Sequence, residues 1–295
     1  MHVGVAGLGR MGAAMAARLA EIGYQVSGWN RSAEKAQPLA AAGVAIVETP
    51  AALAAGADTV ITSLTDAAAI DAVYGGRDGL LSGPVDGRLF IEMSTVPPKV
   101  ETDLAPKVRG KGAIMVECPV GGSTTPAREG KLLGLMGAEP ADAERARPIL
   151  EQMCRKVVHC GPVGAGAAMK LAINLPLMVA WQAYGEAFAI ARSVGWEPQR
   201  LLELFVESNG ANNALKMRAD MIVKMFEGQD PGPTTFSIAN AVKDLRTMVA
   251  TGESLGAEMR ATKAALSGFE DAVGAGIGGG DGAQMTVYWS QRGKK

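Results

Sequence analysis

Residues 3–12 read VGVAGLGRMG, and this stretch decides the fold. Its apolar start predicts a buried strand, and the alanine-rich run that follows, to about residue 22, predicts a helix. A second strand is expected over residues 24–29, which completes a compact βαβ unit. A G-x-G-x-x-G turn between a strand and a helix is typical of dinucleotide-binding domains, whereas the same glycines without that setting indicate only a glycine-rich βα turn.

Each glycine of this turn has its own expected task. Gly7 allows the tight turn, Gly9 lets the backbone approach a pyrophosphate, and Gly12 lets the helix pack closely on the strand. The helix N-terminus adds amide hydrogens and the positive end of a dipole, both of which favour an anion. The predicted cofactor-binding residues of this segment are Gly7, Leu8, Gly9, Arg10, Met11 and Gly12.

The end of the second strand distinguishes between the two nicotinamide cofactors. An acidic residue about twenty positions after the glycines would hydrogen-bond an adenosine ribose 2′-hydroxyl, but this chain has Asn30, Arg31 and Ser32 there. A guanidinium matches a 2′-phosphate in charge and geometry, and the two neutral side chains add hydrogen-bonding groups. We therefore expect NADP(H) rather than NAD(H); the alternative for Arg31 is a solvated arginine in a turn.

Composition indicates an enzyme-like globular chain and excludes several other classes. The chain has 295 residues, 29 basic and 30 acidic side chains, and a net charge of −1, so we expect no binding to nucleic acid or to an anionic membrane. The longest uncharged apolar stretch, residues 171–185, is too short to span a bilayer. Two histidines and three cysteines without C-x-x-C or H-E-x-x-H spacing indicate no metal site and free thiols. With a strand beginning at residue 3 and no signal peptide visible, we expect a cytoplasmic protein.

The chain reads as two halves of different character. In the first half, short β-rich runs alternate with helical ones, which predicts an α/β domain with a doubly wound, mostly parallel sheet over residues 1–162. The second half, residues 163–295, shows only helical patterns, which break at residues 195, 209–210, 228–233 and 274–280. The further strands predicted in the first half are 44–47, 59–64, 88–93, 113–118, 132–136 and 156–160.

The segment 161–174, GPVGAGAAMKLAIN, starts a long helix expected to run to about residue 194. Lys170 and Asn174 stand four positions apart, so an ammonium and an amide lie on one face and can address one small molecule together. A lysine among apolar residues suggests proton transfer. The alternative is a glycine-rich hinge followed by a snorkelling lysine and a helix-interior asparagine. Pro176 predicts a kink just past Asn174.

Five motifs together carry a family resemblance. The chain resembles the β-hydroxyacid dehydrogenases, in particular the 3-hydroxyisobutyrate dehydrogenase and glyoxylate or succinic semialdehyde reductase group, across essentially its whole length. The resemblance implies a Rossmann domain joined by a long helix to an all-α domain, in homodimers or homotetramers whose helices interlock. The motifs, in the family's order, are residues 7–12, 92–95 (EMST), 117–122 (ECPVGG), 161–174 and 243–245 (KDL).

The same resemblance implies roles for individual residues. Lys170 matches the catalytic lysine, Asn174 the amide that positions substrate, and Lys243 a second lysine near the closed cofactor. Leu64 and Thr95 fall where the family contacts the nicotinamide ribose and ring. The implied activity is NADP(H)-dependent reduction of a small aldehyde or keto acid, of the semialdehyde or glyoxylate type, to a hydroxy acid. Lys170 would stabilise the charge on the carbonyl oxygen and deliver the proton.

One motif departs from the family pattern at the expected substrate turn. The family usually presents D-A-P-V-S-G-G, in which the serine and the amides after it hold the acidic group of the substrate. Here the serine position is Gly121, followed by Gly122 and Ser123. A glycine turn still offers amide hydrogens to an anion, and Ser123 can supply a displaced hydroxyl. We expect these residues to bind a small anionic carbonyl or hydroxy acid substrate; the alternative is a plain structural turn.

Three other activities are compatible with parts of this pattern. An imine reductase would share the fold and the Asn-Arg-Ser turn but usually has Asp or Tyr where this chain has Lys170. A decarboxylating enzyme of the 6-phosphogluconate type would be longer and would have a histidine in place of Ile173. A non-catalytic NADPH-binding sensor or partner protein is hard to reconcile with the presence of both Lys170 and Asn174.

Overall fold

The computed structural model describes residues 1–292, which form two compact units. The first unit ends at Lys170 and the second begins at Leu171, so the helix that contains both residues starts in the first unit and continues in the second. The sequence-based division after residue 162 stays a prediction about domain organisation. Among the described residues, no helix combines the length and the apolar character that crossing a membrane requires.

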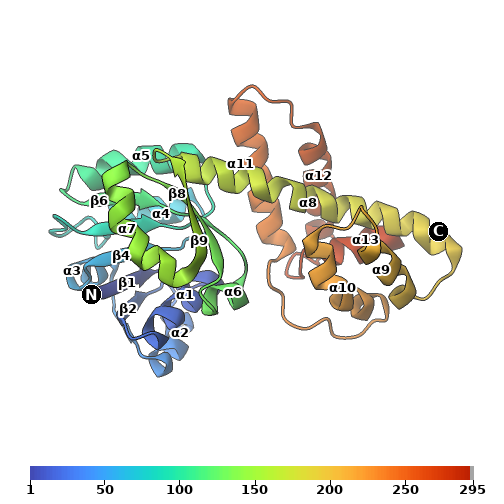
Figure 1. Ribbon diagram of the computed structural model, residues 1–295, viewed down its shortest axis with the longest axis horizontal. Coiled ribbons are helices and arrows are strands. Elements are labelled where there is room, and N and C mark those ends of the chain that lie inside the picture. The colour runs from blue at the N-terminus through green and yellow to red at the C-terminus, as the bar shows by residue number, and fades with distance from the viewer. Residues whose placement is uncertain (293–295) are drawn as a thin grey trace. The chain divides into compact units, whose positions relative to one another are not determined.

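The first unit is built on a mixed, mostly parallel sheet, shown in Figure 1. Its strands are β1 (His2–Ala6), β2 (Gln25–Trp29), β3 (Val44–Ile46), β4 (Thr59–Thr62), β5 (Leu89–Glu92), β6 (Ile114–Glu117), β7 (Val120–Gly121), β8 (Leu132–Gly137) and β9 (Cys154–Gly161). Their order is β3-β2-β1-β4-β5-β6-β8-β7, with β9 beside β8. The pairs from β3 to β6 are parallel, and β8 runs antiparallel to β6. This is the Rossmann-like sheet that the sequence pattern predicts.

The strand order reverses direction between β1 and β4. The chain leaves β1 to form β2 and β3 on one side, and then returns to form β4 on the other side. Such a reversal separates the loops that follow the two central strands, and ligands of doubly wound sheets bind there, outside the carboxyl ends of the strands. The glycine turn after β1 lies at this point.

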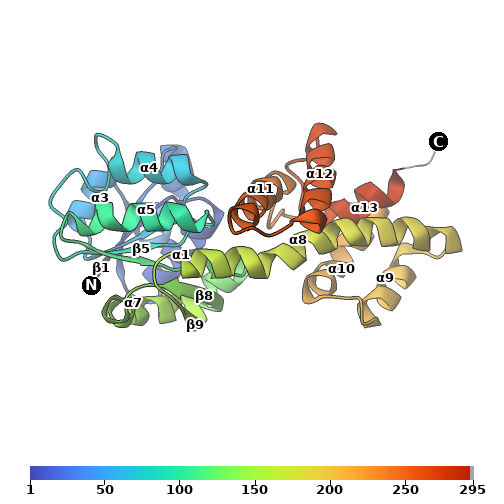
Figure 2. The ribbon, with the colours of Figure 1, turned by 90° about the horizontal axis from the view of Figure 1, so that it is seen from above.

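Helices cover both faces of the sheet, as Figure 2 shows for α3 (Pro50–Gly56), α4 (Ala67–Gly75) and α5 (Pro98–Arg109) on one side and α7 (Pro140–Met153) on the other. The helix α1 (Arg10–Glu21) packs with α7 and with α6 (Thr124–Arg128). A separate apolar core therefore fills each face. The link from β2 to β3 contains α2 (Ala33–Ala36) and a 3-10 helix, Gln37–Ala42.

Up to residue 292, the second unit contains helices and no strand, as predicted. The helix α8 (Ala165–Ala191) is followed by a 3-10 turn and by Gly195 in the left-handed conformation, at the first predicted break. The other predicted breaks also separate helices, but an additional one, at residues 255–259, has no counterpart in the sequence-based prediction. The remaining helices are α9 (Pro198–Glu207), α10 (Asn213–Phe226), α11 (Ile238–Ser254), α12 (Arg260–Gly274) and α13 (Gln284–Gln291).

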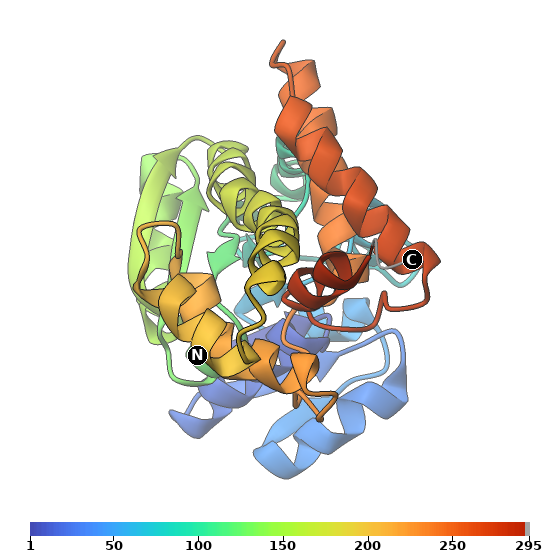
Figure 3. The ribbon, with the colours of Figure 1, turned by 90° about the vertical axis from the view of Figure 1, so that its right-hand side faces the viewer.

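Apolar side chains from all these helices form the core of the second unit. Trp181 and Phe188 of α8 are buried together with Leu245 of α11 and Phe269 of α12. The helices α11 and α12 lie side by side, as Figure 3 shows in orange and red. Pro176 lies inside α8, which remains helical on both sides of it, and the expected kink stays a prediction.

Candidate functional site

The glycine turn after β1 has no room for a side chain at two of its glycines and has open space at the third. Gly7 has a φ of +92°, and a Cβ on it would lie 2.3 Å from the Ser63 carbonyl oxygen. A Cβ on Gly12 would lie 1.9 Å from the Gly7 carbonyl oxygen, so no larger residue fits at either position. Gly9 differs, because no atom lies within 4 Å of its Cβ position, at the N-cap of α1. This open space at a helix N-terminus fits a pyrophosphate.

Asn30 braces the turn from the end of β2. The Leu8 backbone amide donates to Asn30 Oδ1 at 3.1 Å, and Asn30 Nδ2 donates to the Ser32 carbonyl oxygen at 2.9 Å. The side chain thus ties the glycine turn to the segment that follows β2. Arg31 and Ser32 are exposed beside it, and no carboxylate occupies positions 29–32.

Leu64 follows the neighbouring strand β4 and packs against the same glycine turn. Its Cδ2 lies 2.9 Å from the Cβ position of Gly7, and its amide donates to Ser94 Oγ at 2.7 Å. Thr95, the next residue after Ser94, is half-buried. Ser94, which the sequence reasoning did not select, therefore connects the segment after β4 to the segment after β5.

The expected substrate turn combines two glycines with different constraints. A Cβ on Gly121, in β7, would lie 3.6 Å from Leu133 Cβ, which is ordinary van der Waals contact, so a serine side chain would fit there. Gly122 has a φ of +128°, and its Cβ position lies 2.8 Å from Leu132 Cδ2, so glycine is required. Ser123 is the N-cap residue of α6 and makes no side-chain capping hydrogen bond. The packing around Gly121 therefore does not itself require a glycine at this position.

Lys170 and Asn174 lie one helical turn apart on α8. The lysine is only 7% exposed and Asn174 is half-buried, whereas the adjacent Met169 and Ile173 are 45% and 41% exposed. A lysine this buried is rare in folded proteins unless a specific interaction compensates its desolvation. The two polar residues are thus more buried than the apolar residues that immediately precede them in α8.

Lys243 lies in the second unit on α11 and forms an ion pair with Asp244, at 2.9 Å. Its side chain is 34% exposed, and that of Asp244 is 3% exposed. The helix α11 begins at Ile238, with Ser237 as its N-cap, so Phe236 precedes the helix. Phe236 belongs instead to a turn whose amide donates to Asp281.

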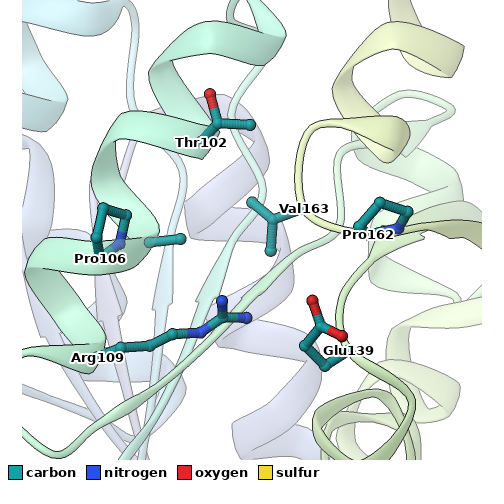
Figure 4. A pocket seen from close by; sticks show the side chains of 7 residues that line it. Thr102, Pro106, Arg109, Glu139, Pro162 and Val163 are labelled. Atoms are coloured by element: carbon teal, nitrogen blue, oxygen red, sulfur yellow. The ribbon is translucent and has the colours of Figure 1, made fainter.

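Sequence reasoning also missed Glu117 as a residue of interest in its own right. Its carboxylate, at the end of β6, accepts from the backbone amides of Gly164 and Gly166 at the start of α8. A shallow hollow of about 450 Å³ lies nearby on the outside of the first unit, between α5 and the Pro162–Val163 turn (Figure 4). None of the predicted site residues lines this hollow.

Two family models together match most of the chain. Residues 2–161 match the family described as the NAD binding domain of 6-phosphogluconate dehydrogenase, and residues 164–289 match NAD-binding of NADP-dependent 3-hydroxyisobutyrate dehydrogenase. The chain belongs to the 3-hydroxyisobutyrate dehydrogenase family. Glyoxylate/succinic semialdehyde reductase 1 of Arabidopsis thaliana, a relative in this family, is 31% identical over 284 residues, which are 94% of this chain and 94% of that protein.

Two further relatives show how wide the family is. The NAD-dependent L-serine dehydrogenase of Pseudomonas aeruginosa is 34% identical over 211 residues, 72% of this chain and 71% of that protein. The solved Mycobacterium tuberculosis 3-hydroxyisobutyrate dehydrogenase with L-serine has a TM-score of 0.84 and 28% identity, covering 97% of this chain and 98% of that one. The chain is thus a β-hydroxyacid dehydrogenase family oxidoreductase with a nicotinamide-cofactor domain. Family membership alone does not establish which substrate or which of the two nicotinamide cofactors the chain uses.

Proposed function

We propose that this chain is an NADP(H)-dependent reductase that converts a small aldehyde or keto acid, of the semialdehyde or glyoxylate type, to a hydroxy acid. The observation that carries the proposal is the buried Lys170 one turn from Asn174 on α8. A buried ammonium beside a neutral amide suits a reaction in which negative charge develops on a carbonyl oxygen. The dinucleotide turn between β1 and α1 supports the same reaction class.

In the proposed mechanism, Lys170 transfers the proton and Asn174 positions the substrate. When bound, the nicotinamide supplies the hydride. The Lys170 ammonium stabilises the developing oxyanion and then donates its proton to that oxygen. Asn174 stays neutral at every working pH, so it holds the carbonyl group in place without competing for the proton. In the oxidative direction, the neutral lysine takes the hydroxyl proton back.

The preference for NADP(H) rests on the end of β2. Arg31 is exposed there, so its guanidinium is free to turn towards a 2′-phosphate. Asn30 holds the adjacent backbone through Leu8 and Ser32, which keeps the arginine beside the glycine turn. Because no carboxylate is present at positions 29–32, a ribose 2′-hydroxyl has no acidic acceptor there.

The substrate is proposed to carry an acid group held by the Gly121–Ser123 turn. Gly122 is exposed with its amide in a left-handed backbone, and the Ser123 hydroxyl makes no capping bond. Consecutive amides in such a turn form a concave site for an anion. Lys243, in α11, is proposed to act on the cofactor rather than on the substrate.

The substitution Lys170→Ala tests the proposed function. We expect turnover to fall by about 100-fold or more because a general acid is lost, while the Kd for NADPH measured by fluorescence titration stays unchanged. Lys156→Ala, an exposed lysine on β9, is the control for loss of one charge. Turnover by Lys170→Ala at the wild-type rate would rule out the mechanism.

A rate panel with NADPH separates the candidate substrates. It compares glyoxylate, succinic semialdehyde, methylmalonate semialdehyde, sulfolactaldehyde and a cyclic imine. Turnover of one of the carbonyl acids is the expected result. Turnover of the imine alone would favour an imine reductase, and NADPH binding with no turnover of any compound would favour a sensor or partner protein.

A further inference from the structure

Three buried carboxyl groups occupy the first unit close to the start of α8. Glu92, Glu101 and Glu117 are each 0% exposed. Glu92 accepts from the Ser94 amide at 2.7 Å and from the Thr62 hydroxyl. Within residues 1–292, neither oxygen of Glu101 has a hydrogen-bond partner. Burying three acidic groups in one apolar region costs free energy because their negative charges lose water and repel one another, so their presence calls for a physical explanation.

Glu117 is the member of this group that contacts α8. Its Oε1 accepts from the Gly164 amide at 2.6 Å and from the Gly166 amide at 2.8 Å. These amides are among those at a helix N-terminus that have no partner within the helix. The helix dipole also favours an anion at this end. One carboxylate oxygen thus holds the first turn of α8 against the end of β6.

Glycines allow this close approach. A Cβ on Gly137, in β8, would lie 2.1 Å from Glu117 Oε1, and a Cβ on Gly166 would lie 2.2 Å from the Leu135 carbonyl oxygen. Gly164 has a φ of +101°, a backbone conformation that residues other than glycine rarely adopt. The backbone of α8 therefore lies directly on β8 at Gly166, one helical turn before Lys170.

We propose that Glu117 is a positioning residue, whose carboxylate fixes the start of α8 on the sheet and thereby sets where the Lys170 ammonium lies. The inference rests on the function proposed above for Lys170. A helix is stiff over one turn, so a shift of its first turn moves Lys170 with it. A misplacement of about 1 Å can cost about 100-fold in rate, so the position of this anchor matters to catalysis.

The charge of this anchor changes near neutral pH. Burial raises the pKa of Glu117 to about 7, against the lowering effect of the Gly166 and Gly164 amides, and the charge of Glu92 raises it further. Burial also raises the pKa of Glu92 to about 6, and burial followed by the charges of Glu92 and Glu117 raises the pKa of Glu101. The thiols of Cys118 and Cys160 also interact electrostatically with Glu117. Lys170 follows Gly166 by one turn of α8. Protonation as the pH falls below about 7 removes the charge from the anchor and weakens it.

Two variants of Glu117 test the proposal. Glu117→Gln keeps an acceptor oxygen and removes the charge, whereas Glu117→Leu removes the acceptor. We expect Glu117→Leu to lower kcat by about tenfold to 100-fold, to leave the Kd for NADPH unchanged, and to speed amide hydrogen exchange at residues 164–167. We expect the kcat of the wild type to fall below about pH 7 and the kcat of Glu117→Gln to lack this fall, a difference that a merely structural role would not produce.

Glu101→Gln is the matched control, because it removes a buried carboxyl of the same group that makes no hydrogen bond to α8. It should keep the fall in kcat below about pH 7. Wild-type kcat in Glu117→Leu, or the same fall in Glu117→Gln, would overturn the proposal. If Glu117→Leu does not fold, the pH profile of Glu117→Gln decides alone. Lys170→Ala distinguishes the proposed function from the positioning role of Glu117. Full activity of Lys170→Ala would refute the proposed function. An inactive Lys170→Ala together with a fully active Glu117→Leu would refute only the role of Glu117.

Discussion

At the scale of single residues, the neighbouring side chains of Asn30 and Arg31 differ in what they contact. Asn30 uses its side chain within the protein, through the Leu8 amide and the Ser32 carbonyl. Arg31 stays exposed beside it. The first residue therefore shapes the turn, and the second is the one that can recognise a ligand by its charge. This division makes the arginine the better position for changing the cofactor preference.

Arg31→Ala is expected to reduce kcat/KM with NADPH by about tenfold to 100-fold, because a charge-assisted contact contributes roughly 1.5–3 kcal/mol. The value with NADH should change little. Steady-state rates with both cofactors measure this. Lys35→Ala, an exposed lysine on α2, is the control for net charge. An unchanged ratio between the two cofactors would contradict the assignment of NADP(H).

At the scale of elements, the β1–α1 turn separates glycines that shape the protein from a glycine that leaves room for a ligand. Gly12 is needed because its Cβ position lies 1.9 Å from the Gly7 carbonyl oxygen. Gly9 has nothing within 4 Å of its Cβ position. The same residue type thus serves packing at one position and ligand access at another.

A pair of alanine substitutions distinguishes these two roles. Gly9→Ala should leave the Tm unchanged and weaken NADPH binding, because its methyl group enters the space proposed for the pyrophosphate. Gly12→Ala should lower the Tm as well, because the turn and α1 must move apart. Thermal melting with and without NADPH measures both effects. A lower Tm in Gly9→Ala without cofactor would show that its space is needed for packing.

At the scale of the whole molecule, the buried carboxyl groups make the stability depend on pH. The pKa of Glu117 is raised to about 7 and that of Glu92 to about 6, from 4.5, so the folded state binds protons that the unfolded state has released. Stability is therefore highest at the acid end of this interval and falls as the pH rises from about 4.5 to about 7. For Glu117 alone the loss amounts to roughly 3 kcal/mol.

We therefore expect the Tm of the wild type to be higher at about pH 6 than at about pH 8. Differential scanning calorimetry at constant ionic strength measures the difference. Glu117→Gln should reduce it, because the amide does not ionise. A Tm that rises between these two pH values would contradict the upward pKa shifts of both carboxyl groups.

The surface of α8 leads to a prediction about assembly. Ile173 is 41% exposed near its start and Ile190 is 76% exposed near its end. We propose that a second copy covers such side chains in a homodimer or homotetramer, and sedimentation velocity should find no monomer at micromolar concentration. Ile190→Glu should shift the chain towards monomer, whereas Leu255→Glu, at an equally exposed leucine outside α8, should not. A monomeric wild type would refute this.

Local features of this chain could be predicted because they depend on short-range geometry. The βαβ unit, the breaks at Gly195 and after α9, and the four-residue spacing of Lys170 and Asn174 follow from strand and helix periods and from glycine chemistry. The two-residue strand β7 and the break at residues 255–259 were missed. Neither has a local signal, because β7 exists only through pairing with β8 and the break has no proline or paired glycines to mark it.

The sequence by itself determined the alternation of strands and helices in the first unit, the helical character of the second unit and the glycine turn after β1, because each depends on a few neighbouring residues. Only the tertiary structure decided what holds the start of α8 in place. Glu117 meets Gly164 and Gly166 across 47 and 49 residues, and the Leu8 amide meets Asn30 across 22. Contacts of this kind depend on strand order and on the burial energy of the whole unit, which no local pattern encodes.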